Sequence, residues 1–220
     1  MGKLIVIEGL DGSGKSTQIE LLKAYLDENC INYKQIKLPD YEDKSSTLVK
    51  MYLQGDFGNK PDDVNAFASS SFYAVDRFAS YKRHWGDDYN NGTLILADRY
   101  TTSNAVHQTC KLQESQWDNY LDWLYDFEFN LIKIPKPDLV LYFDMHPDIS
   151  QRLMSHRYKG DEGKKDIHER DTEYLKHCRK AALYAANRLG WSVITCFEGD
   201  EPLSIESIFE KVKAEVLKVL

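Results

Sequence analysis

The sequence lacks any long apolar segment. No run of apolar residues among the 220 approaches the roughly 20 that a membrane-spanning helix needs. No signal peptide precedes the first apolar run, which begins at Leu4. We therefore expect a protein that does not enter a membrane and that works in the cytoplasm.

Positive charge and cysteine are also scarce. The chain has 28 Lys and Arg residues against 35 Asp and Glu, which gives a formal net charge of -7. This balance argues against general binding to nucleic acid or to a membrane surface, because both require basic surface. The four cysteines form no C-x-x-C pair, so we expect reduced thiols and neither disulfides nor a zinc site.

A glycine-rich stretch near the start organises the chain. Residues 4–8 are mostly β-branched and apolar, which predicts a buried strand. Residues 9–16 fit the phosphate-binding P-loop pattern G-x-x-x-x-G-K-[ST]. An amphipathic segment over residues 15–28 follows, and the amino end of such a helix favours an anion. The strand before and the helix after argue against an ordinary glycine-rich turn, so we expect a nucleoside triphosphate to bind here.

The residue types of this loop suit the chemistry of a triphosphate. Glycines let backbone N–H groups come close to an anion and converge on it. Lys15 is long enough to reach the β- and γ-phosphates, and the Ser16 hydroxyl is a ligand for Mg²⁺. The predicted nucleotide contacts are Gly9, Leu10, Asp11, Gly12, Ser13, Gly14, Lys15, Ser16 and Thr17.

Strand and helix patterns alternate along the rest of the chain. Further strands are predicted over residues 33–38, 93–97, 139–143 and 191–196. Helices are predicted over residues 48–53, 64–85, 100–109, 117–132, 147–157, 166–188 and from 205 onward. This alternation predicts an α/β protein, with a three-layer P-loop fold in which a five-stranded parallel sheet is flanked by helices. We expect one kinase domain over residues 1–220.

Charged residues occupy three positions of note. Asp98 and Arg99 close the third strand, at the sheet edge where parallel sheets carry their ligands, so a functional role is favoured. Arg77 lies next to Asp76 within a predicted helix, where a solvated surface pair is the ordinary interpretation. Residues 152–170 hold six basic residues against four acids, which indicates either a solvated loop or a lid that closes over phosphates.

The motifs, taken together and in order, resemble the thymidylate kinase family. The resemblance covers nearly the whole chain and rests on the P-loop with its embedded acid and on residues 38–40, 73–77, 98–100, 135–139 and 166–171. It implies transfer of the γ-phosphoryl group of ATP to dTMP, giving dTDP and ADP for dTTP synthesis. It also implies a Mg²⁺ cofactor, a mobile lid over about residues 152–166 and a homodimer, with neither nucleic acid nor membrane as a partner.

The resemblance also assigns catalytic roles. The implied catalytic set is Asp11, Lys15, Arg99 and Arg157. Asp11 is placed near the sugar 3′-hydroxyl and the magnesium shell. Arg157 is preferred as the lid arginine and Arg152 is second, because glycine and serine follow the loop acid where some relatives have arginine. The implied metal ligands are Ser16 and Asp98, and the adenine contact is expected near residues 198–201.

A second set of residues is implied for dTMP. Arg77 and Arg99 correspond to a pair that grips the acceptor phosphate, and Tyr73 replaces an aromatic residue that stacks on thymine. The other implied substrate contacts are Ser103 and Asn104 at the base, His107 beside the deoxyribose, and Gln108, Pro39 and Asp11.

Three other functions remain open at this point. A related kinase with another acceptor, such as a deoxynucleoside or dUMP, would share the loop and differ in an acceptor panel. A GTP-binding switch would need a guanine-reading motif after a late strand, whereas N-K-P-D at residues 59–62 follows a polar turn. A P-loop interaction module without catalysis would not need the intact Asp11, Lys15 and Ser16.

Overall fold

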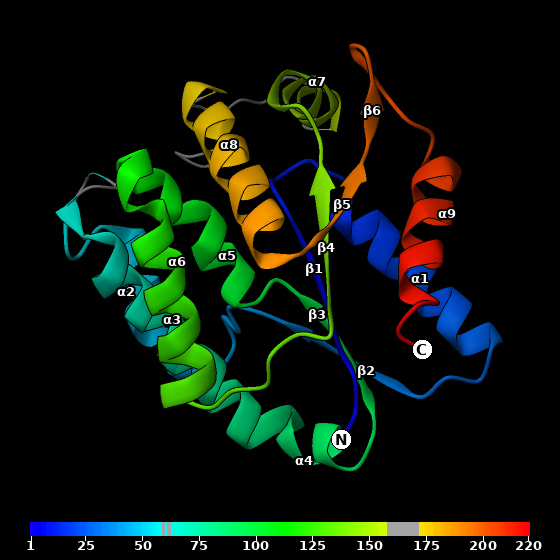
Figure 1. The fold of residues 1–220 in the computed structure, drawn as a ribbon, viewed down its shortest axis with the longest axis horizontal. Helices are drawn as coiled ribbons and strands as arrows, with labels where there is room; N and C mark the ends of the chain where they lie inside the picture. Colours follow the sequence, from blue (N-terminus) through cyan, green and yellow to red (C-terminus); the bar gives the residue numbers. More distant parts are fainter. Residues whose placement is uncertain (59, 61–62, 158–171) are drawn as a thin grey trace. The chain divides into compact units, whose positions relative to one another are not determined.

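A computed structural model describes residues 1–58, 60, 63–157 and 172–220 (Figure 1). The chain divides into two compact units, residues 1–6 with 32–138 and residues 7–31 with 139–220. The single kinase domain and its lid stay predictions. Residues 158–166 of the proposed lid lie outside the described residues, as do residues 166–171, where the helix over residues 166–188 is predicted to begin.

The predicted five-stranded sheet is confirmed. Its strands are β1 (Leu4–Gly9), β2 (Tyr33–Lys37), β3 (Leu94–Asp98), β4 (Leu139–Asp144) and β5 (Ser192–Thr195), in the order β2-β3-β1-β4-β5. β2 pairs in parallel with β3, and β4 pairs in parallel with β5. Every residue of β1 and β3 is buried, as expected for strands of a sheet that helices cover.

The first unit contains most of the helices. They are α2 (Thr47–Gln54), α3 (Ala66–Ser80), α4 (Gly86–Asn90), α5 (Thr101–His107) and α6 (Trp117–Tyr125), with short 3₁₀ turns η1 (Lys44–Ser46), η4 (Thr109–Lys111) and η5 (Glu114–Gln116). α3 and α6 each continue into a π-helical turn, η3 (Tyr81–Trp85) and η6 (Asp126–Leu131). The two longest predicted helices of this unit are therefore α-helices with π-helical ends, and α4 was not predicted.

The buried face of α3 is polar, which corrects one expectation. Phe67 and Phe78, which mark the predicted apolar periodicity, are 42% and 39% exposed. The residues that α3 buries are Ala66, Ser69, Ser70, Ala74, Asp76, Arg77 and Ser80. The interpretation of Asp76 and Arg77 as a solvated surface pair is therefore wrong, because each is buried and hydrogen-bonded to a different neighbouring element.

The second unit carries the glycine-rich loop and, in its described residues, four helices. These are α1 (Lys15–Glu28), α7 (Pro147–Arg157), α8 (Thr172–Leu189) and α9 (Ile205–Val216). α1 and α9 lie side by side (Figure 1), where the Gln18 amide donates to the Ile205 carbonyl at 2.9 Å. β6 (Phe197–Glu198) and β7 (Glu201–Pro202) form a small antiparallel hairpin, where the adenine contact is expected. None of the helices in the described residues could cross a membrane.

Candidate functional site

The glycine-rich loop connects β1 directly to α1. The Ser13 amide donates to the Leu10 carbonyl at 3.2 Å, which closes the turn. The buried Glu8 carboxylate accepts from the Gly9 amide at 2.9 Å. The Ser13 Oγ is buried and has no hydrogen-bond partner among the described residues. The loop therefore holds a buried hydroxyl with unused hydrogen-bonding capacity beside the start of a helix, an arrangement that suits a phosphate oxygen.

Glycine is required at two positions of this loop. Gly9 has a φ of 158°, and a Cβ there would lie 3.0 Å from the Phe143 carbonyl oxygen and 2.7 Å from the Ser13 Oγ. Gly12 has a φ of 76°, and a Cβ there would lie 3.0 to 3.2 Å from Ser150 and Met154 of α7. Both positions combine a backbone conformation that is unfavourable for other residues with close packing. β4, which carries Phe143, and α7 therefore constrain the path of the loop.

Lys15 folds back over the loop that precedes it. Its Nζ donates to the Gly9 carbonyl at 2.8 Å and to the Leu10 carbonyl at 3.0 Å. The Asp11 carboxylate lies 3.9 Å from the same nitrogen. Lys15 is 9% exposed and Asp11 is partly exposed. The ammonium group is therefore held at the loop by carbonyl dipoles, close to where a phosphate would sit.

Of the two arginines considered for the lid, the structure describes the side chain of Arg152 and not that of Arg157. Arg152 of α7 donates to the Asp200 carbonyl in the β6–β7 hairpin, and its guanidinium lies 3.7 Å from the Glu201 carboxylate. Arg157 is the last residue of α7, and its side chain lies outside the described part of the chain. The choice between them stays a prediction. Arg152 does connect α7 to the hairpin where the adenine contact is expected.

The end of β3 carries the predicted acceptor arginine in a strained conformation. Arg99 has a φ of 69°, a left-handed value that costs a residue with a Cβ about 1–2 kcal/mol. Such strain is concentrated at functional sites, where surrounding structure imposes it. The neighbouring Asp98 is buried. This end of the strand offers one cation and one carboxylate.

The first turns of α5 bring three predicted residues together. The Arg99 Nη1 lies 3.4 Å from the Ser103 Oγ and 3.4 Å from the His107 Nε2. Ser103 and His107 are one helical turn apart, so their side chains share one face. All three residues are partly exposed. The structure thus groups the predicted phosphate, base and sugar contacts, and their individual roles stay predictions.

Tyr73 of α3 belongs to the same neighbourhood. Burial raises the pKa of its phenol well above the usual range, and the phenols of Tyr41 and Tyr52 raise it further. The charges of Arg77 and Arg99 oppose this rise. Both guanidinium groups are therefore close enough to act electrostatically on the Tyr73 hydroxyl, as expected if these residues serve one ligand.

The segment around Pro39 is fastened to α3 by Asp76. The Asp76 carboxylate accepts from the Ser45 hydroxyl at 2.6 Å and from the Asp40 amide at 3.2 Å. Burial raises the pKa of this carboxyl, while the hydrogen bonds from Ser45 and Asp40 lower it. The chain after β2 is thereby held against the helix that carries Tyr73, which places Pro39 near the other predicted acceptor contacts.

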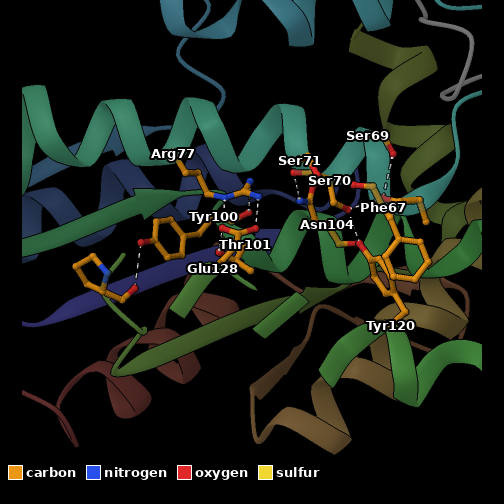
Figure 2. A network of polar contacts seen from close by, with 12 residues as sticks. Phe67, Ser69, Ser70, Ser71, Arg77, Tyr100, Thr101, Asn104, Tyr120 and Glu128 are labelled. Atoms are coloured by element: carbon orange, nitrogen blue, oxygen red, sulfur yellow. Dashed lines mark hydrogen bonds and ion pairs between the residues drawn. The ribbon is translucent and has the colours of Figure 1, made fainter. Parts of the chain in front are cut away.

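Arg77 is bound by an acid that the sequence did not single out. Its Nε and Nη2 donate to the two oxygens of Glu128 at 2.6 and 2.5 Å, and its Nη1 donates to the Tyr100 carbonyl at 3.4 Å (Figure 2). Glu128 follows the buried Leu124 by four residues. A charged residue at the helical spacing of a buried stripe was the available signal.

The two remaining candidates, Asn104 and Gln108, tie α5 to α3. The Asn104 amide donates to the Ser70 carbonyl at 3.2 Å (Figure 2), and the Gln108 carbonyl oxygen accepts from the Ser69 hydroxyl at 2.7 Å. Both are at most 4% exposed. Each therefore has a structural contact, and a ligand contact for either stays a prediction.

One further group of ligand atoms has a different explanation. Atoms of Asp40, Asp43 and His84 lie within 4.8 Å of one another. Asp43 accepts two hydrogen bonds from the Arg83 guanidinium at 2.8 Å and contacts the His84 ring at 2.8 Å. These contacts and the amide of Ser45 hold the pKa of Asp43 well below its usual range. The cluster thus contains its own cation and anchors the loop after β2 to η3.

Known proteins resemble this chain over most of its length. The family model described as thymidylate kinase matches residues 7–200. Thymidylate kinase of Mycobacterium tuberculosis is 28% identical over 184 residues, which cover 83% of this chain and 84% of that protein. Thymidylate kinase of Caenorhabditis elegans is 30% identical over 155 residues, covering 68% and 66%.

A solved structure shares the fold. Thymidylate kinase from Candida albicans, an enzyme of broad substrate specificity, superposes with a TM-score of 0.68 at 22% identity, over 99% of this chain and 92% of that one. The family model itself spans the glycine-rich loop, the end of β3 and α7, and on that match the chain belongs to the thymidylate kinase family.

Proposed function

We infer that this protein transfers the γ-phosphoryl group of ATP to dTMP, giving dTDP and ADP in dTTP synthesis. The carrying observation is the match of the thymidylate kinase model over residues 7–200, which includes a loop suited to a triphosphate. A cytoplasmic location fits the four cysteines, none of which forms a disulfide.

ATP is proposed to bind the loop over residues 9–17. The Ser13 hydroxyl, which lacks a partner among the described residues, is available to a phosphate oxygen. Lys15 would exchange its bonds to the Gly9 and Leu10 carbonyls for the β- and γ-phosphates. That exchange is favourable because a charge-assisted bond to phosphate is stronger than a bond to a neutral carbonyl.

Mg²⁺ is proposed as the cofactor, with Ser16 and Asp98 as its protein ligands. A hydroxyl and a carboxylate are hard oxygen donors of the kind that Mg²⁺ accepts, often beside phosphate oxygens and water. The Ser16 side chain is exposed at the start of α1, and Asp98 is buried at the end of β3. When bound, the ion neutralises charge on the β- and γ-phosphates.

The acceptor is proposed to bind residues of the first unit. Arg99 would hold the dTMP phosphate, with Arg77 as its partner, and Tyr73 would stack on the base. The contacts proposed for the rest of the nucleotide are Pro39, Ser103, Asn104, His107 and Gln108. The geometry supports this, since the Arg77 Nη1 donates to the carbonyl of Tyr100, the residue that follows Arg99. Planar guanidinium groups hold phosphate oxygens with defined geometry.

The transfer step asks for positioning and charge stabilisation. The acceptor is already a phosphate oxygen anion, so no general base is needed. Asp11 is proposed to orient the acceptor sugar near the metal. Arg157, or Arg152 as the second choice, is proposed to stabilise charge on the transferred group, and an arginine in that role is worth on the order of 10³-fold or more in rate.

An acceptor panel tests the proposed activity. With ATP and Mg²⁺, we expect ADP production with dTMP to exceed by far that with dUMP, thymidine, dCMP or dGMP, and chelation of divalent ions by EDTA to abolish it. Coupled ADP detection measures both. Activity with thymidine alone would identify a nucleoside kinase, and GTP hydrolysis without any acceptor would favour a GTP-binding switch.

A homodimer is proposed from an apolar surface of the first unit. Phe67, Val75 and Phe78 lie along one face of α3 and are 39% to 49% exposed. Trp123 of α6 packs on Phe67 at 4.7 Å between ring centroids and stacks on Phe127 at 5.1 Å. Exposed apolar residues on one helix beside half-buried aromatic residues of its neighbour are typical of an interface, and a second copy of the chain is the proposed occupant.

The dimer can be disrupted by one charge. We expect Val75→Glu to convert a dimer to a monomer in sedimentation velocity, because the carboxylate would lose its water in the interface. Leu217→Glu, at a 53% exposed position beyond α9, is the matched control and should stay dimeric. A wild-type monomer at micromolar concentration would contradict the proposal.

A further inference from the structure

A buried carboxylate organises the polar interior of the first unit. Glu128, in the π-helical turn η6, is 0% exposed. Its Oε2 accepts from the Arg77 Nε at 2.6 Å and from the Thr101 Oγ1 at 2.7 Å, and its Oε1 accepts from the Arg77 Nη2 at 2.5 Å (Figure 2). Three separate elements, α3, α5 and η6, thus meet at one carboxylate.

A buried ion pair such as Arg77–Glu128 is an energetically unfavourable way to hold helices together. Removing two charges from water costs several kcal/mol for each, and apolar residues of similar volume often stabilise a protein equally well or better. The pair lies beside Tyr100, and the Glu128 charge helps to raise the pKa of that buried phenol. π-Helical turns are themselves rare and recur at functional sites. A role beyond packing explains why the chain keeps the buried Arg77–Glu128 pair and the π-helical turn that carries Glu128.

The two hydrogen bonds to Glu128 also determine which N–H groups of Arg77 are left for a ligand. Its guanidinium is planar, and Glu128 occupies the edge formed by Nε and Nη2. At the Nη1–Nη2 end of the guanidinium, Nη1 donates a long bond of 3.4 Å to the Tyr100 carbonyl. Three of the five guanidinium N–H groups are thus used within the protein. The two unused N–H groups lie on Nη1 and Nη2, so a ligand that meets Arg77 meets this end of the guanidinium and cannot be held by the Nε–Nη2 fork.

We propose that Glu128 is a positioning residue for acceptor binding, which fixes the guanidinium of Arg77 so that its Nη1–Nη2 end faces the acceptor nucleotide and its Nε–Nη2 edge does not. The proposal rests on the proposed function, in which Arg77 contacts dTMP. Thr101 of α5 donates a hydrogen bond to the same carboxylate and so helps to hold it in place. Because Glu128 balances the charge of Arg77, the dianionic acceptor phosphate depends chiefly on Arg99.

The rival explanation is that Glu128 only braces α3 against η6. The two explanations differ in what they predict for the substrates. A brace would affect stability, and any kinetic damage would extend to ATP and dTMP alike. A positioning residue changes the KM for dTMP, leaves the KM for ATP nearly unchanged, and loses its influence once Arg77 is gone.

Glu128→Gln is the first variant, because it keeps length and one acceptor oxygen while its amide opposes an Arg77 donor. We expect the KM for dTMP to rise roughly 10- to 100-fold, as displaced positioning groups do, with the KM for ATP changed less than about twofold. Thr101→Val leaves the ion pair in place and should raise the KM for dTMP about threefold by loss of one hydrogen bond. It also provides a readout if Glu128→Gln does not fold.

A double-mutant cycle separates the explanations. In an Arg77→Met background, Glu128→Gln should change the KM for dTMP by less than about twofold, since no guanidinium remains to be positioned. Glu215→Gln, whose carboxylate bonds Ser192 and Lys218, is the matched control and should leave both KM values unchanged. Equal shifts of the KM for dTMP and the KM for ATP, or additive effects in the cycle, would overturn the positioning role of Glu128 and leave the proposed function standing. A wild-type protein without dTMP turnover would overturn the proposed function as well.

Discussion

Lys15→Met is expected to lower kcat for dTMP phosphorylation by about 100- to 1,000-fold, the usual loss when one preorganised charge-stabilising donor is removed. The ammonium group lies at the loop, bonded to the Gly9 and Leu10 carbonyls, and is the loop's cation for the phosphates. Methionine keeps the length and apolar volume of the stem, so the packing around a residue that is 9% exposed is preserved.

The measurement is steady-state kinetics at saturating ATP and dTMP, with thermal unfolding recorded on the same samples. Lys23→Met is the matched control on α1, since Lys23 pairs with Glu20 at 2.9 Å on the outer face, and such surface pairs contribute little. A Lys15→Met variant that keeps more than a tenth of wild-type kcat would contradict the assignment of Lys15 to the transferred phosphate.

Arg99→Ala is expected to raise the KM for dTMP by about 100-fold and to change the KM for ATP by less than about twofold. A charge-assisted, two-pronged bond to the acceptor phosphate is lost, and such bonds are the strongest hydrogen bonds in proteins. The dependence on Arg99 is large because Glu128 already balances the charge of Arg77. Arg99→Lys should give an intermediate KM, because lysine supplies the charge without the planar fork.

Initial rates over a matrix of ATP and dTMP concentrations measure both KM values. Arg83→Ala is the control, since Arg83 is an exposed arginine of the same unit that pairs with Asp43. Equal losses for the two substrates would contradict the role of Arg99 at the acceptor. An unchanged KM for dTMP would remove the dTMP phosphate from the end of β3.

Local patterns in the sequence were sufficient for the five strands of the sheet and for most of the helices, whereas α4 and the β6–β7 hairpin were missed. The predicted bounds of α1 and α7 agree with the structure, and each predicted strand lies within two residues of its observed range. β-Branched runs, a glycine-rich turn and helical periodicity are properties of neighbouring residues, so they can be read without knowledge of the fold. The same holds for the loop over residues 9–17, whose function depends on its own backbone.

Polar burial could not be read in the same way. Asp76 and Arg77 look like surface residues because charged side chains seldom go inside, and apolar periodicity pointed to Phe67 and Phe78. The helix instead buries its polar face, where Ser45 and Glu128 satisfy those charges from other elements. Whether a charge is buried depends on partners that are distant in sequence, 31 and 51 residues away here.

The sequence by itself therefore determined the strand–helix order, the phosphate-binding loop and, through its motifs, the family. Only the tertiary structure decided that Glu128 pairs with Arg77, that Asp76 fastens the segment at Pro39, and that Thr101 joins the same carboxylate. The physical reason is that a loop's dipoles are set by local backbone geometry, whereas the orientation of a buried charge is set by the opposite charge that meets it across the fold.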